Sequence, residues 1–261
     1  MITRVLTIAG SDSGGGAGIQ ADLKTIGVLG AHGMSAITAV TAQNTLGVLG
    51  IHALEPAFVR LQIEAVLDDI GVDAVKTGML ATAAIIDAVA RVLEDRRPAP
   101  LVVDPVLAAE SGAGLLEGSA AASLMRRLVP LATLVTPNAA EAAQLLGMTV
   151  ATVDDQRRAA RRFVEAGAAA ALIKGGHLEG PDAVDVLCVG TALHELSAPR
   201  LDRTNTHGTG CILASAIAVH LGRGEPLLNA VEKAKQFVSR AIAGGLAIGG
   251  GAGPANPFAN A

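Results

Sequence analysis

The sequence predicts a three-layer α/β/α sandwich built on a mostly parallel central sheet, as a single domain over residues 1–261. Short apolar runs of strand length alternate with amphipathic stretches of helix length almost throughout the chain. The short runs are continuous in Ala, Val and Leu, which is typical of parallel strands buried on both faces. No repeat, linker or low-complexity segment divides the chain into smaller units.

The first half of the chain alternates strand and helix signals. Strand signals are runs of aliphatic and β-branched residues, whereas helix signals are apolar positions that recur every three to four residues. Pro56 suits the first turn of a helix, where the missing N–H is not needed. The expected strands are 5–9, 35–40, 73–76 and 101–103, and the expected helices are 17–29, 56–69 and 81–94.

The second half continues the alternation and closes on two long helices. Asn138 is a good N-cap residue, and Gly147 suits the end of the helix that follows it. Gly190 and Thr191 separate two short strands, which indicates a hairpin near an edge of the sheet. The expected helices are 119–128, 138–147, 154–166, 209–221 and 226–247, and the expected strands are 133–135, 171–174, 184–189 and 193–196.

Composition argues against two classes of partner. Hydrophobic residues make up 51% of the chain, but charges, glycines or prolines interrupt every apolar run before the roughly 18 residues that a membrane span needs. The net charge is −4, and the basic pairs 157–158 and 161–162 are spaced like the solvated face of a helix. We therefore expect no membrane and no nucleic-acid partner.

The cysteines and the first residues indicate a cytoplasmic protein. Cys188 and Cys211 fall in different expected elements, without the spacing of a metal site. Residues 1–9 have too short an apolar core for a signal peptide and are better explained as a first strand. A reducing cytosol is the expected compartment.

The segment Gly208-Thr209-Gly210-Cys211 stands directly before a long apolar helix. The first N–H groups of a helix lack intrahelical partners, and the helix dipole adds positive potential there, so the segment predicts an anion site. The same field is expected to lower the pKa of Cys211. Glycines that only ease a tight turn are the simpler explanation, but Cys211 and the neighbouring His207 favour phosphoryl transfer with a base nearby.

Glycines and polar residues also follow the expected strands. Ligands of parallel α/β sheets bind beyond the carboxyl ends of the strands, so these segments are expected around one cleft. The sequence has no GxxxxGK[ST] motif, no GxGxxG in register, no GxSxG elbow and no HExxH helix. The segments are 10–18, 41–45, 77–79, 104–106, 136–141 and 174–177.

Several of these segments carry a resemblance to a known family. They are Ile8–Ser13 with Gly18–Lys24, Thr41–Thr45, Lys76–Leu80, Asp104–Val106, Thr136–Glu141, Lys174–His177 and Thr206–Cys211. In this order they resemble the bacterial hydroxymethylpyrimidine/phosphomethylpyrimidine kinases of thiamine biosynthesis, in the ribokinase-like superfamily. Such enzymes phosphorylate 4-amino-5-hydroxymethyl-2-methylpyrimidine with ATP, and then convert the monophosphate to the diphosphate.

The resemblance implies roles at the phosphate end of the cleft. Gly208, Thr209, Gly210 and Cys211 would form an anion hole for the transferring phosphoryl group, with Cys211 as the base for the substrate hydroxyl. ATP and Mg²⁺ are the implied cosubstrate and cofactor. Lys174 would neutralise ATP phosphates, Asp104, Asn138 and Thr206 would lie on the ATP side, and Glu141 and Asn138 would hold Mg²⁺, Glu141 through water. Asn138 is also explained as a plain N-cap.

The resemblance also implies a pyrimidine pocket. The Gln43 amide offers a donor and an acceptor that match the 4-amino group and ring nitrogen of a pyrimidine, although a solvent-facing loop glutamine is the simpler explanation. Asp22 is placed at the substrate but could merely satisfy a helix dipole. The implied substrate-binding residues are Gly10, Asp22, Gln43, Met79, Val106 and His207, with Met79 and Val106 against the ring and the role of His207 open.

Two positions depart from the family pattern, and the assignment has rivals. Glu110 stands where relatives usually carry Lys, and Pro257 where they tend to have His, so no ligand contact is expected from either position. A pyridoxal or pyridoxine kinase is the nearest alternative, because related enzymes share the fold and some share the cysteine. A non-catalytic nucleotide-binding regulatory domain is the other. The argument against it is the joint presence of four residues, Lys174, Asn138, Glu141 and Cys211. The family implies a homodimer.

Overall fold

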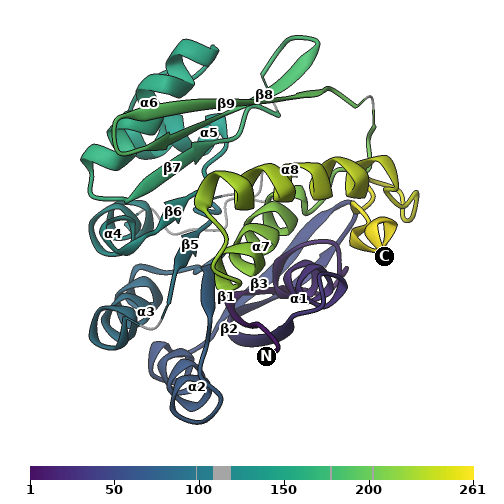
Figure 1. The fold of residues 1–261 in the computed structure, drawn as a ribbon. Coiled ribbons are helices and arrows are strands. Elements are labelled where there is room, and N and C mark those ends of the chain that lie inside the picture. Colours follow the sequence, from purple (N-terminus) through teal and green to yellow (C-terminus); the bar gives the residue numbers. More distant parts are fainter. Residues whose placement is uncertain (98, 108–118, 177, 202) are drawn as a thin grey trace.

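The computed structural model describes residues 1–97, 99–107, 119–176, 178–201 and 203–261, and the predictions at Glu110 and His177 lie outside them. The described residues form the predicted three-layer sandwich (Figure 1). A nine-stranded sheet with the order β3-β2-β1-β4-β5-β6-β7-β8-β9 stands between two layers of helices.

Six neighbouring strands of the sheet are parallel, and the strands at its two edges are antiparallel. The six parallel strands include four that are only two to four residues long and buried throughout, which explains their largely apolar sequences. They are β2 (His32–Asn44), β1 (Arg4–Asp12), β4 (Ala74–Thr77), β5 (Leu101–Val103), β6 (Leu134–Val135) and β7 (Ala170–Ile173). The edge strands are β3 (Gly47–Ala53), β8 (Asp182–Val189) and β9 (Ala192–Pro199).

The helices divide between the two faces of the sheet, and each layer has its own apolar core. One face carries α2 (Pro56–Asp69), α3 (Ala83–Arg96), α4 (Ala120–Arg127), α5 (Ala139–Leu146) and α6 (Val153–Glu165). The other carries α1 (Gly18–Val28), α7 (Thr209–Gly222) and α8 (Leu227–Ala243). Two short 3₁₀ turns, η1 (Val129–Leu131) and η2 (Pro257–Asn260), complete the described elements.

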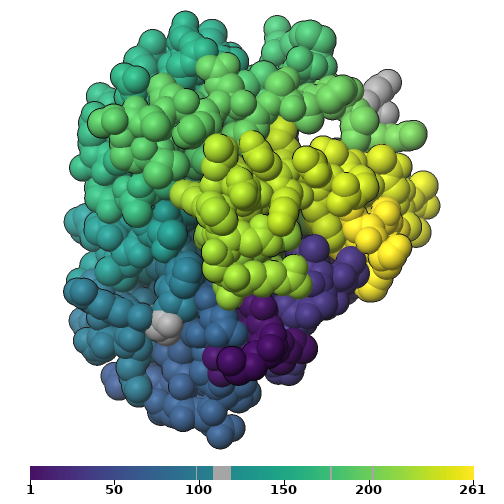
Figure 2. Space-filling model, in the orientation of Figure 1, coloured from purple at the N-terminus to yellow at the C-terminus, as the bar shows by residue number. Residues whose placement is uncertain are grey.

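Helix α7 lies between the sheet and α8, so it is buried nearly all round. Every residue from Ile212 to Leu221 is buried, which explains why this helix has no polar stripe. Figure 2 shows α8 across the front of this layer. The C-terminal part of the chain, in yellow and yellow-green, lies beside the N-terminal part, in purple. None of the described helices is long and apolar enough to cross a membrane.

One part of the sequence prediction was wrong. The second strand does not end at residue 40 but continues to Asn44, and β3 pairs with it as an antiparallel hairpin. The residues of β3 are exposed or only partly buried, so the inward-facing apolar pattern that identifies a strand is missing. As a consequence, Gln43 lies on a strand and not in a loop.

Candidate active site

The carboxyl ends of the parallel strands surround a cavity of about 540 Å³. This volume is typical of a small-molecule site. Parallel α/β sheets commonly bind ligands at this position, beyond the carboxyl ends of the strands. Every predicted site residue except Asp22 lines the cavity. These residues are Gly10, Gln43, Met79, Asp104, Val106, Asn138, Glu141, Lys174, Thr206, His207, Gly208, Thr209, Gly210 and Cys211.

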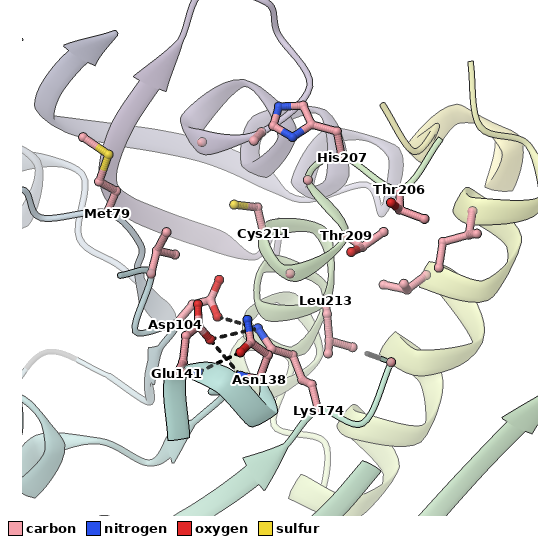
Figure 3. A pocket seen from close by; sticks show the side chains of 18 of the residues that line it. Met79, Asp104, Asn138, Glu141, Lys174, Thr206, His207, Thr209, Cys211 and Leu213 are labelled. Carbon is pink, nitrogen blue, oxygen red and sulfur yellow. Dashed lines mark hydrogen bonds and ion pairs between the residues drawn. The ribbon is translucent and has the colours of Figure 1, made fainter. Parts of the chain in front are cut away.

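The N-terminus of α7 forms one wall of the cavity, as Figure 3 shows. Gly208 begins the helix with φ +85°, and no side chain caps the first turn. A Cβ on Gly208 would overlap the carbonyl oxygen of Gly16, so only glycine brings these two backbones together. The wall therefore presents uncapped backbone of residues 208–211 and the positive end of the helix dipole to a ligand.

Cys211 lies in the first turn of α7, between the two ends of the cavity (Figure 3). Its pKa is raised to about 12, first by burial and then by the carboxylates of Asp22 and Asp104. Lys76 and a hydrogen bond with the backbone of Gly18 act in the opposite direction but do not compensate. The predicted lowering of this pKa was therefore wrong, because desolvation outweighs the helix terminus.

A cation and two carboxyl groups meet at one end of the cavity. Lys174 Nζ lies 3.0 Å from Asp104 Oδ1 and 3.9 Å from Glu141 Oε2, and Thr136 donates to Asp104 at 3.0 Å. Burial alone would lower the pKa of Lys174, but the two carboxylates outweigh it and raise that pKa. Lys174 is therefore a fixed positive charge beside the start of α7, which suits the phosphates of a nucleotide.

Asn138 and Glu141 form a reciprocal cap on α5. Glu141 N donates to Asn138 Oδ1 at 2.8 Å, and Asn138 N donates to Glu141 Oε2 at 2.7 Å. The N-cap explanation of Asn138 is therefore correct, and the residue lines the cavity as well. Burial raises the pKa of Glu141 to about 7, although Lys174 opposes the shift.

The oxygen atoms at this end also fit a hard cation. Among the described residues no group of three or more His, Cys, Asp and Glu side chains could hold a metal ion. Mg²⁺ commonly takes only one or two carboxylates and completes its octahedron with water and substrate phosphates. Asp104 and Glu141 match that sparse donor set, whereas the capping bond already uses one acceptor site of Asn138.

The opposite end of the cavity carries Gln43, His207 and Met79. Gln43 is half-buried, with its amide 3.2 Å from Thr41 Oγ1 and 3.4 Å from His207 Nε2. Met79 is buried, and its sulphur and terminal methyl group pack closely over Gly10. A planar amide beside a polarisable thioether is a suitable pocket for a flat polar ring.

Sequence reasoning assigned no role to Asp12, which organises the first glycine-rich loop. Its Oδ2 accepts from the backbone of Gly16 at 3.0 Å and Ala17 at 2.8 Å, and it lies 3.1 Å from His207 Nε2. Burial alone would raise the pKa of Asp12, but these bonds lower it. An aspartate within a glycine-rich turn was the available signal.

Lys235 was also missed, because a lysine on an amphipathic helix usually faces solvent. It reaches from α8 into the cavity wall and lies 2.6 Å from Asp185. Asp185 in turn accepts from the backbone of Gly175 at 2.8 Å, beside Lys174. The pair supports the strand end that carries Lys174. The departure at Pro257 lies in η2, outside the cavity lining.

Asp22 lies behind the cavity wall and not in it. Its carboxylate accepts from Thr7 at 2.6 Å, Ser215 at 2.8 Å and Lys76 at 2.8 Å, and both Asp22 and Lys76 are fully buried. The simple explanation of Asp22 as a partner of its own helix dipole is also wrong, since these partners come from β1, β4 and α7. Direct contact of Asp22 with a substrate stays a prediction.

Comparisons with known proteins agree with this geometry. The chain is 55% identical over 250 residues to the hydroxymethylpyrimidine/phosphomethylpyrimidine kinase of Streptomyces coelicolor, covering 96% of this chain and 92% of that protein. It is 52% identical over 252 residues to the thiamine biosynthesis bifunctional protein ThiED of Geobacter sulfurreducens, with 97% of this chain aligned but only 51% of that longer protein.

A solved structure of a related kinase has the same fold. An ADP complex of Bacillus subtilis pyridoxal kinase superposes with a TM-score of 0.92 at 37% identity, covering 99% of this chain and 98% of the other. The sequence profile described as phosphomethylpyrimidine kinase matches residues 12–256. The chain therefore belongs to the phosphomethylpyrimidine kinase family.

Proposed function

We propose that this protein is an ATP-dependent kinase that phosphorylates 4-amino-5-hydroxymethyl-2-methylpyrimidine and then converts the monophosphate to the diphosphate, in thiamine biosynthesis. The observation that carries the proposal is the order of groups along one cavity. His207, with the Gln43 amide beside it, lies at one end, Lys174 lies at the other, and the start of α7 with Cys211 lies between them (Figure 3). The names of the family and of the relatives support the same reaction.

In the proposed reaction the substrate ring lies between Gln43 and Met79, with its hydroxymethyl group at Cys211. In its thiolate form, Cys211 takes the hydroxyl proton while the oxygen attacks the γ-phosphorus of ATP, and the bond between phosphorus and the leaving ADP oxygen breaks. The backbone of residues 208–211 stabilises charge on the transferring phosphoryl group. Lys174 neutralises charge on the nucleotide phosphates, with Asp104, Asn138 and Thr206 on the same side.

Asp104 and Glu141 would hold Mg²⁺, Glu141 through water. When bound, the ion supplies charge neutralisation for the ATP phosphates. The high pKa of Cys211 in the free protein, about 12, makes proton transfer the step most sensitive to the surroundings of the thiol.

We further propose that the protein acts in the cytoplasm as a homodimer. ATP is available in that compartment, and the two cysteines are free thiols. The dimer proposal rests on the β2–β3 hairpin and the start of α2. This edge of the sheet exposes apolar side chains at Val40, Leu46, Leu49, Ile51, Phe58 and Leu61. An unpaired edge strand with such side chains is a ready surface for a second copy.

Pyridoxal phosphorylation is the second candidate function, favoured by the TM-score of 0.92 to a pyridoxal kinase. Both candidate substrates present a hydroxymethyl group on a flat nitrogen ring. They differ in the amino group and second ring nitrogen, which only the pyrimidine offers to the Gln43 amide.

An assay of ATP consumption with hydroxymethylpyrimidine, its monophosphate and pyridoxal in parallel tests the proposal. We expect turnover of both pyrimidines and slower turnover of pyridoxal at equal concentration. Faster use of pyridoxal would assign the second function, and ATP binding without turnover of any acceptor would favour a regulatory domain.

A further inference from the structure

A lysine ammonium group lies fully buried in the floor of the cavity. Lys76, on β4, has no exposed side-chain surface, and its Nζ lies 2.8 and 3.0 Å from the two oxygens of Asp22. A Cβ on Gly78 would lie 2.8 Å from this nitrogen, so the glycine leaves the space that the ammonium group occupies. The kinase mechanism described above does not use this ion pair.

Stability alone does not account for the pair. Removing two charges from water costs several kcal/mol per ion, and replacing a buried ion pair with apolar residues of similar volume is often neutral or stabilising. The face of the sheet that carries Lys76 is otherwise largely apolar, with Ala74 on the same strand and Val102 in register on β5. The buried ammonium group of Lys76 is therefore better explained by an effect on a neighbouring group.

Cys211 is that neighbour, since both side chains line the same cavity. Ser215 donates to Asp22 Oδ1 at 2.8 Å, and Cys211 precedes Ser215 by one turn on the same face of α7. Electrostatic coupling between Lys76 and Cys211 acts on both groups, lowering the pKa of the thiol and raising that of the ammonium. The ion pair and the thiol thus form one cluster across α1, β4 and α7.

Four charged groups surround the thiol. Asp22 from α1 and Asp104 after β5 disfavour the thiolate, whereas Lys76 from β4 and Lys174 after β7 favour it. Lys174 is bound to Asp104 and Glu141 at the phosphate end, where the nucleotide competes for its charge. Within the described part of the chain, Lys76 pairs with Asp22 alone, and both side chains are fully buried.

We propose that Lys76, held in place by Asp22, is a positioning residue that stabilises the thiolate of Cys211 when the thiol serves as the base. The inference rests on the proposed kinase function for its purpose. The thiolate accepts the proton of the substrate hydroxyl, the resulting oxygen forms the bond to phosphorus as ADP leaves, and the thiol later releases that proton to solvent. Lys76 itself neither gains nor loses a proton.

The charge coupling is tested without any substrate, by alkylating the protein with iodoacetamide across a range of pH and measuring Cys211 by mass spectrometry. Only the thiolate reacts, so the rate reports the thiolate fraction. We expect Lys76→Met to slow alkylation of Cys211 at fixed pH about tenfold or more, equivalent to one pKa unit. Lys76→Arg should stay close to the natural protein.

Two further variants separate charge from damage to the fold. Asp22→Asn should accelerate alkylation of Cys211, and the double variant Lys76→Met/Asp22→Asn should lie between the single variants. Cys188 is fully buried and reports unfolding in every sample, because it reacts only when the core opens. Equal rates at Cys211 in all four variants, with Cys188 protected, would overturn the proposal.

The kinase assay then distinguishes this inference from the proposed function. Lys76→Met should move the ascending, acidic limb of the pH–rate profile for hydroxymethylpyrimidine to higher pH, because that limb follows ionisation of the base. It should spare the monophosphate, whose acceptor is already ionised. If alkylation of Cys211 depends on residue 76 but the protein phosphorylates no pyrimidine, the proposed function is contradicted and the coupling is not. An active kinase in which the alkylation rate of Cys211 is the same in every variant at residue 76 would contradict the coupling alone.

Discussion

Cys211 lies in the wall of the cavity, at the start of α7, where its ionisation is unfavourable. Its pKa of about 12 means that almost none of it is thiolate near neutral pH in the free protein. A role as base therefore requires a nearby cation such as Lys76 to favour the thiolate. The first proposed step needs a base more than the second, because only the first acceptor carries a proton that must be removed.

We expect Cys211→Ala to reduce turnover of hydroxymethylpyrimidine by about 10²–10⁴, the usual contribution of a general base, and to affect the monophosphate much less. Cys211→Asp should recover part of the first activity, since a carboxylate is ionised at neutral pH. Steady-state rates with each acceptor measure the difference. Equal losses in both steps would instead indicate that the start of α7 is distorted.

Gln43 is expected to decide recognition of the ring. Gln43→Leu retains the approximate volume but leaves the amino group and ring nitrogen against an apolar wall, and each unsatisfied polar group costs roughly 1–3 kcal/mol. Affinity for the pyrimidine should fall at least about tenfold, or 1.4 kcal/mol. Calorimetry with a non-hydrolysable ATP analogue is the control, because that ligand should bind as before. Normal pyrimidine binding, or equal weakening of both ligands, would place the ring elsewhere.

The types of the site residues were predictable at this scale, but their ionisation was not. A glycine-rich helix start favours an anion site, and Lys174 follows a clear strand. The pKa of Cys211 depends on Asp22, which is 189 positions earlier in the sequence, and on how much water the fold removes. Neither the distance from Asp22 to Cys211 nor the burial of the thiol can be read from spacing along the chain, so the direction of the pKa shift was predicted wrongly.

At the scale of elements, the start of α7 depends on its contact with the loop that precedes α1. Gly208 has φ +85° and its Cα faces the carbonyl group of Gly16. Gly147, which ends α5, has a similar φ of +61° but open space around it. Substituting alanine at Gly147 therefore tests only the cost of a left-handed backbone, whereas alanine at Gly208 adds the cost of a steric overlap.

We expect Gly147→Ala to lower stability by about 1–2 kcal/mol, the ordinary cost of a left-handed conformation for alanine, without affecting the site. Gly208→Ala should cost more, because the new methyl group has to displace the backbone of Gly16. Binding of ATP analogues should weaken sharply in Gly208→Ala and remain normal in Gly147→Ala. Thermal unfolding and calorimetry measure the two effects, and a Gly208→Ala protein with normal nucleotide affinity would contradict this account.

The helices and parallel strands were largely predictable from periodicity, since burial on one face or on both leaves a clear pattern. The β3 strand was not, because an edge strand that contributes little to the core carries no such pattern. The length of β2 was missed for the same reason, as residues 41–44 alternate between buried and exposed only in the context of their partner.

At the scale of the whole molecule, the exposed hairpin edge is the feature that a monomer leaves unexplained. Leu49 on β3 is 80% exposed and Leu46 in the hairpin turn is 71% exposed, far more than a leucine in a core. Single exposed apolar residues are common, but a group of them along one edge marks an interface.

We expect the protein to elute as a dimer, and Leu49→Glu to shift it to a monomer, in size-exclusion chromatography with light scattering. Val189→Glu is the matched control. Val189 is a partly exposed apolar residue on β8, towards the other edge of the sheet, and its change should leave the dimer intact. A monomeric natural protein, or a dimer that tolerates Leu49→Glu, would remove this interface.

The contact between Asp12 and His207 joins segments that are 195 positions apart in the sequence. Contacts of such long separation require a large loop to close, so they form late when a chain folds. The sheet from β1 to β7 pairs mostly between neighbours along the chain, and the core on the face of α2 to α6 can begin to assemble before α7 is available. The anion site is therefore expected to mature last, and a ribosome-bound chain that already resists proteases should still fail to bind a nucleotide.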